Sequence, residues 1–90
     1  MTVEAKQATK VDLLIVVSGT PIEMNVNVHE TLHDLFQPAV KKAGIAGQQS
    51  PAEWEFTYNK VVLDQNKPIR EFGFPEKAQI FLNKKAGAAG

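Results

Sequence analysis

One amphipathic segment in the middle of the chain limits what the protein can fold into. Apolar residues recur there at intervals of three and four, which predicts a helix with one apolar stripe: Leu32, Leu35, Phe36, Ala39, Val40 and Ala43. Thr31 suits the N-cap, Asp34 the capping-box position and Gly44 the left-handed position beyond the end. Pro38 falls inside the segment, so we expect a kink there, or a helix that begins late with Pro38 in its first turn.

Strand-forming segments lie on both sides of this helix. The apolar run VDLLIVV and the alternating run PIEMNVNV, joined by the turn SGTP, predict an antiparallel hairpin. After the helix, WEFTY predicts a strand, the turn NK leads to a short returning strand VVL, and AQIFL is the last strand. One helical turn is expected around residues 69–72. We therefore predict an α+β domain with the helix lying across one face of a sheet.

The predicted core draws on both the helix and the strands. Its members are Leu14, Val16, Ile22, Met24, Val26, Leu32, Leu35, Ala39, Ile45, Phe56, Tyr58, Leu63, Ile69, Ile80 and Leu82. Residues 1–10 are polar and lack periodicity, which predicts a flexible arm. The last eight residues, NKKAGAAG, have no side chain to bury. The domain should therefore cover residues 11–83, followed by a flexible tail at residues 84–90.

The composition excludes several classes of site. The 90 residues include no cysteine, which rules out thiolate metal sites, disulfides and thiol nucleophiles. Ten basic residues balance ten acidic ones, so the overall charge does not point to nucleic acid or to a membrane surface. The sequence has no long apolar run, no Gly-rich phosphate loop and no nucleophile with an evident base. We expect a cytoplasmic, monomeric protein that is not an enzyme and needs no cofactor.

The stretch HETLH, which begins at His29, matches H-E-x-x-H, a pattern in which two histidines on one helical face bind zinc. Here the helix is expected to begin near Thr31, which leaves His29 in the preceding turn and only His33 on the helix. Zinc in such a site also needs a third protein ligand, and the chain has only two histidines. Glu30 and Asp34 fit another interpretation, because acidic side chains are favourable near a helix N-terminus. We favour that interpretation.

The stretch KVVLDQNKPIREFGFPEKAQIFL carries a resemblance to a known family. A short strand ends in leucine, an acidic residue follows, and a polar loop leads to an apolar–x–x–aromatic turn, a closing strand and a basic tail. The residues concerned are Leu63, Asp64, Ile69, Phe72, Ile80, Leu82, Lys84 and Lys85. This course resembles the ubiquitin-like β-grasp family over about residues 11–90. The resemblance implies a mixed sheet of four or five strands, and it extends to bacterial ubiquitin-like proteins encoded beside E1-, E2- and deubiquitinase-like enzymes.

Several positions in the sheet and its loops depart from the family pattern. Phe72 replaces a tyrosine whose hydroxyl forms a hydrogen bond in that loop in ubiquitin. The outward positions that form the apolar patch of ubiquitin are polar here, at Glu55, Thr57 and Asn83. Phe81 is then the one large apolar residue expected on that face. It is either a contact for a partner or an ordinary exposed aromatic side chain.

The resemblance implies three alternative functions, which differ in what happens to the C-terminal tail. In the first, Gly90 is activated by an E1-like enzyme and joined to target proteins. In the second, the protein is a non-conjugated interaction module; in the third, it is a sulfur carrier with a C-terminal thiocarboxylate. Ala88 and Ala89 precede Gly90 where conjugated members have Gly-Gly, and they are small enough for a narrow enzyme channel. Lys84 and Lys85 either meet acidic groups at such a channel or are simply solvated.

We predict that the protein does not bind zinc stoichiometrically, because the helix excludes His29 from a shared face with His33. Calorimetric titration of the protein with a zinc salt should give no saturable heat. Binding tighter than micromolar that disappears in a His33→Ala variant would contradict this prediction.

Overall fold

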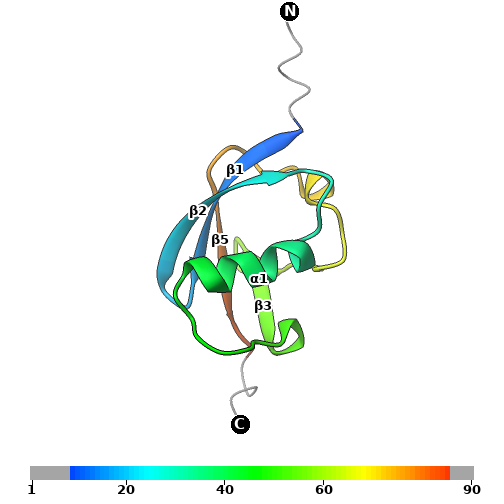
Figure 1. The fold of residues 1–90 in the computed structure, drawn as a ribbon. Helices are drawn as coiled ribbons and strands as arrows, with labels where there is room; N and C mark the ends of the chain where they lie inside the picture. Colours follow the sequence, from blue (N-terminus) through cyan, green and yellow to red (C-terminus); the bar gives the residue numbers. More distant parts are fainter. Residues whose placement is uncertain (1–8, 86–90) are drawn as a thin grey trace, which may run out of the picture.

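The computed structural model describes residues 9–85, and its elements follow the expected order (Figure 1). They are β1 (Lys10–Val17), β2 (Thr20–Asn27), α1 (Leu32–Lys42), η2 (Pro51–Glu53), β3 (Trp54–Tyr58), β4 (Val61–Val62), η3 (Ile69–Phe72) and β5 (Ala78–Lys84). The two elements labelled η are single turns of 3-10 helix. None of the helices in this part of the chain has the length and apolar character needed to cross a bilayer.

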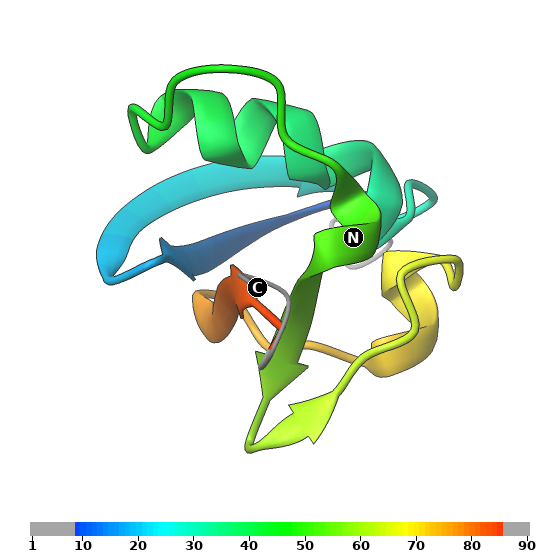
Figure 2. The same cartoon turned by 90° about the horizontal axis from the view of Figure 1, so that it is seen from below.

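The strands form one mixed sheet in the order β2-β1-β5-β3-β4. β1 pairs antiparallel with β2 and parallel with β5, while β3 pairs antiparallel with both β5 and β4. Strands from opposite ends of the described chain therefore lie side by side in the middle of the sheet. α1 crosses one face of the sheet and leaves the other face open, as Figures 1 and 2 show. This is the predicted ubiquitin-like β-grasp arrangement, with five strands.

Both hairpins close through turns of two residues with positive φ. Ser18 and Gly19 have φ of 46° and 88°, and Asn59 and Lys60 have φ of 53° and 67°. Tight two-residue turns of this kind match the right-handed twist of the strands that they join. The first turn is shorter than the predicted SGTP, since β2 already begins at Thr20.

α1 runs without interruption from Leu32 to Lys42. The predicted capping box is present, because the Asp34 N–H donates to Thr31 Oγ1 (3.2 Å) and the Thr31 N–H donates to Asp34 Oδ2 (3.1 Å). Such a cap stabilises a helix by about 1 kcal/mol. Pro38 lies in the middle of α1 and is exposed, so the alternative of a helix that begins late is wrong. Gly44 follows with a φ of 82°, as predicted for the position beyond the end.

The core fills the space between α1 and the sheet. Its buried members are Val11, Leu13, Ile15, Val17, Ile22, Val26, Leu32, Leu35, Phe36, Ala39, Val40, Trp54, Phe56, Ile69, Ala78, Ile80 and Leu82. Other predicted members are partly buried and pack against it: Met24, Ile45, Tyr58 and Leu63.

The prediction that Leu14 and Val16 belong to this core is wrong. Both lie half-buried on the open face of the sheet, and the odd-numbered residues of β1 face α1. The pairing of Ile15 with Ile22 fixes this choice, because directly paired residues share a sheet face. The run VDLLIVV is apolar on both faces, so its own pattern does not distinguish them.

We predict that Pro38→Ala stabilises the protein, by up to ~3 kcal/mol, because a proline inside a helix removes a backbone hydrogen bond and clashes with the preceding turn. Urea denaturation followed by circular dichroism would measure the change. Lys41→Ala, at another exposed position of α1, serves as the control for surface substitution and should have little effect. A clear loss of stability in Pro38→Ala would contradict the helix described here.

Candidate functional site

The base of the tail, which we define as Lys84 and Lys85, is tied to the start of β3. Lys84 pairs with Trp54 in the sheet, and its Nζ lies 5.9 Å from the centre of the indole ring. The Lys85 N–H donates to the Glu53 carbonyl (2.9 Å). Sheet pairing thus continues past the predicted domain end at residue 83, because β5 extends to Lys84.

The remaining predicted tail residues lie outside the described part of the chain. These are Ala88, Ala89 and Gly90. The predicted mobility of the tail therefore stays a prediction for residues 86–90.

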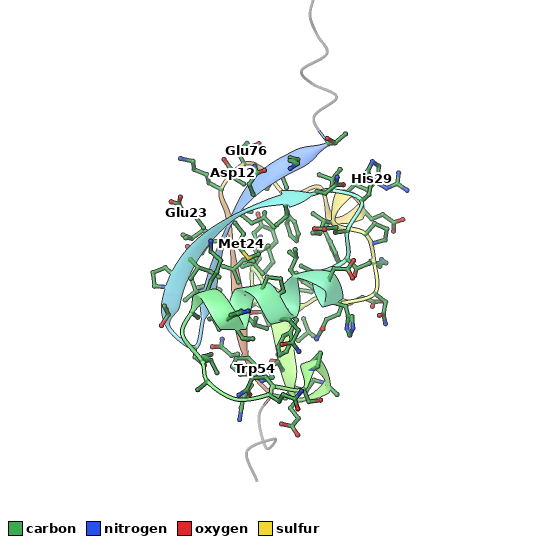
Figure 3. All side chains as sticks on the ribbon, in the orientation of Figure 1. Asp12, Glu23, Met24, His29, Trp54 and Glu76 are labelled. Carbon is green, nitrogen blue, oxygen red and sulfur yellow. The ribbon has the colours of Figure 1, made fainter. Side chains whose placement is uncertain are left out.

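Trp54 connects the tail base with the core. Its side chain is 2% exposed, and its ring meets that of Phe36 on α1 edge to face, with 5.8 Å between the ring centroids. Figure 3 shows Trp54 below α1, at the end of the sheet where β3 begins. A cation over an aromatic face stabilises by about 0.5–1 kcal/mol at an exposed site, so Lys84 adds a modest restraint to the sheet pairing.

A surface hollow of about 350 Å³, which we call the tail-base hollow, opens beside these residues. Its lining comes from the start of α1, from η2 and β3, from β4 and the loop after it, and from the tail base: His33, Pro51, Ala52, Trp54, Glu55, Val62, Leu63, Gln65, Asn66 and Lys85. The hollow is shallow and largely open to solvent.

The open face of the sheet carries an apolar row. Register places Val16 beside Phe81, Phe81 beside Thr57 and Thr57 beside Val62. Phe81 is 40% exposed and Val62 is 59% exposed. The sequence predicted that Phe81 is the one large apolar residue of this face. This prediction is wrong, because Val62 is exposed on the same face. Glu55 is half-buried and lies on the same outward side of β3 as Thr57, and its role as a surface contact stays a prediction.

The two histidines lie in different elements, as predicted. His29 is in the turn before α1, where its N–H donates to Asn27 Oδ1 (2.8 Å), whereas His33 is in the first turn of the helix. Within residues 9–85, no group of three or more His, Cys, Asp or Glu side chains is placed to hold a metal ion. The expected absence of zinc binding stays a prediction.

Sequence reasoning missed most of the tail-base hollow. Val62, Leu63 and Gln65 are the main omissions, and only Val62 had a usable signal. Val61 and Val62 are adjacent in a short strand, and successive side chains of a strand point to opposite faces. One of the two valines therefore had to point away from α1. The structure leaves both of them about 60% exposed.

Comparison with protein families matches residues 6–90 to the family described as Protein of Unknown function (DUF2604). The chain belongs to this family. A relative of the DUF2604 chain, the uncharacterized protein y4jI of Sinorhizobium fredii (strain NBRC 101917 / NGR234), is 36% identical to it over 83 residues. The match covers 90% of this chain and 62% of that protein, so the chain spans less than two thirds of the length of this relative.

Solved structures show that the DUF2604 chain has a ubiquitin-like fold. Caldiarchaeum subterraneum ubiquitin superposes with a TM-score of 0.69 at 16% identity, covering 84% of this chain and 94% of that one. A de novo design based on ubiquitin gives 0.72 at 15% identity, covering 92% and 98%. A protein described under "Molecular Mimicry of SUMO promotes DNA repair" gives 0.69 at 16% identity, covering 82% and 90%. At these identities the likeness concerns the fold alone.

We predict that this DUF2604 protein does not bind domains that recognise ubiquitin through its apolar sheet patch. Glu55 occupies an outward position in that region, and burying an unpaired carboxylate in an apolar contact is costly. Titration of such a domain into labelled protein, followed by NMR, should leave the spectrum unchanged, whereas ubiquitin itself serves as the positive control. A chemical-shift footprint centred on Glu55 and Thr57 would contradict the prediction.

Proposed function

We propose that this DUF2604 member is a ubiquitin-like modifier whose Gly90 is activated by an E1-like enzyme and then joined to target proteins. The protein itself is not an enzyme in this proposal but the substrate of one. Its carboxylate attacks the α-phosphate of ATP and releases pyrophosphate, which leaves Gly90 as an acyl adenylate. An amine of the target, either directly or after transfer of the acyl group to an enzyme thiol, then attacks the carbonyl, forms an amide bond and displaces AMP or the thiol with release of a proton. The proposal places the reaction on Gly90 and recognition on the folded domain.

The observation that carries this proposal is the position of the C-terminal strand. β5 lies in the middle of a ubiquitin-like sheet, and backbone pairing holds it up to Lys85. The sequence that follows, AGAAG, contains only alanine and glycine. Five extended residues span roughly 16 Å. A terminal carboxylate at that distance can enter an enzyme channel while the folded domain remains outside.

The composition of the tail supports the same proposal. Alanine and glycine leave a segment narrow enough for a channel that admits backbone but no bulky side chain. Gly90 has no Cβ, so the activated carbonyl is open to attack from both sides. Ala89 differs from the glycine of conjugated ubiquitin-like proteins, and its methyl group is the main steric cost that the channel must accommodate.

We predict that the E1-like enzyme from the same genome catalyses ATP–pyrophosphate exchange with the full chain and not with a chain that lacks Gly90. Ala89→Gly is the matched control, since it restores the Gly-Gly ending and should give exchange at least as fast as the original chain. Exchange that is absent for all three chains, or unaffected by removal of Gly90, would favour a non-conjugated interaction module.

The intact mass of the untagged protein, purified from its own host, separates the remaining possibilities. A modifier should be recovered as a free carboxylate, together with a larger species in which it is linked to a target. A mass that corresponds to a C-terminal thiocarboxylate would favour a sulfur carrier instead.

A further inference from the structure

Two half-buried side chains in the lining of the tail-base hollow, Glu55 and Gln65, carry hydrogen-bond acceptors, and the exposed side chains of His33 and Asn66 carry others. Gln65 Nε2 donates to the Trp54 carbonyl (3.2 Å) and to the Pro51 carbonyl (3.5 Å). These contacts turn the amide nitrogen of Gln65 toward the protein and leave Oε1 as the acceptor of the side chain. Glu55 contributes a carboxylate. Both side chains are half-buried, so their acceptor groups are held more firmly than those of a fully exposed residue.

Apolar groups complete the lining between these acceptors. Val62 and Leu63 come from β4 and the residue after it, and Trp54 comes from the start of β3. Val62 is 59% exposed, so a large part of its surface is available to a ligand. A hollow with apolar walls and two half-buried acceptors, one of them a carboxylate, matches a side chain that has an apolar stem and a cationic head with several donors.

Arginine fits this description better than lysine. Its planar guanidinium presents five N–H donors in a fixed geometry and can donate to two acceptors at once. The lysine ammonium is a compact charge that is more strongly hydrated, so it loses more on entering a partly apolar hollow. Hydrogen bonds from a guanidinium to a carboxylate are also among the strong ones in proteins.

We infer that the tail-base hollow binds an arginine side chain of a protein partner, with Glu55 and Gln65 as the acceptors and Val62 and Leu63 against the stem. The inference rests on the geometry of the hollow and holds whether or not Gly90 is activated. Lys85 also lines the hollow and is exposed, so its positive charge opposes the entry of a guanidinium group. A partner that binds here also contacts the base of the tail.

The test uses the full chain and blocked arginine, N-acetyl-arginine methylamide, as the probe in an NMR titration. Saturable shifts are expected at the methyl groups of Val62 and Leu63, at the Glu55 amide and at the Trp54 indole, with a dissociation constant in the millimolar range. Blocked citrulline has the same shape without the charge and should bind several-fold more weakly. Blocked lysine should also bind more weakly than blocked arginine.

Three variants test which charged residues determine the affinity for blocked arginine. Glu55→Gln should weaken binding of blocked arginine several-fold, because it removes the carboxylate and keeps the side-chain shape. Glu53→Gln is the matched control, since Glu53 is exposed and lies outside the lining, and it should leave binding unchanged. Lys85→Gln should tighten binding, because it removes the opposing positive charge.

Several results would overturn the inference. Shifts that fail to saturate, or that spread over the surface away from Val62 and Leu63, would show that the hollow is not a binding site. Equal affinity for arginine and citrulline, or equal effects of Glu55→Gln and Glu53→Gln, would remove the role of the carboxylate. Weaker binding after Lys85→Gln would show that Lys85 supports the bound arginine side chain and does not oppose it.

Discussion

The parallel pairing of β1 with β5 is the contact on which the rest of the structure depends. Residues 13–17 pair with residues 78–82 and join the β1–β2 hairpin to the β3–β4 hairpin in one sheet. α1 then covers a continuous apolar surface to which both halves contribute. Because β5 is central, its end lies next to the start of β3, and this places Lys84 over Trp54 and opens the tail-base hollow at the same end of the sheet.

Local patterns in the sequence were sufficient to predict the elements, because each pattern reflects contacts within one segment. The capping box at Thr31 and Asp34 is an example, since both partners lie in one helical turn. The orientation of β1 was predicted wrongly. Leu14 and Val16 are as apolar as their neighbours, and only the pairing with β2 determines which side of β1 faces α1. Pro38 also shows what local patterns cannot predict. Helix propensity disfavours proline at this position, yet packing against the sheet holds a continuous helix there.

The candidate site was less predictable than the fold. The tail base could be located because a basic pair follows the last apolar strand. The hollow beside it combines residues from the first turn of α1, from η2 and β3, from β4 and its following loop, and from the tail, and no spacing in the sequence brings these together. The orientation of the Gln65 amide depends on two backbone carbonyls that are more than ten residues away in the chain. Such an acceptor becomes visible only in three dimensions.

The central position of β5 also affects how the protein responds to mechanical force. The start of β1 and the end of β5 lie at opposite ends of two adjacent parallel strands, as Figure 1 shows. A pull on both ends of the chain therefore loads the hydrogen bonds between these strands in shear, so they must fail together and not one after another. The force needed to unfold the domain by pulling on its two ends should therefore be higher than its size suggests. A hairpin such as β1–β2, pulled from its open end, would instead separate one pair of residues at a time.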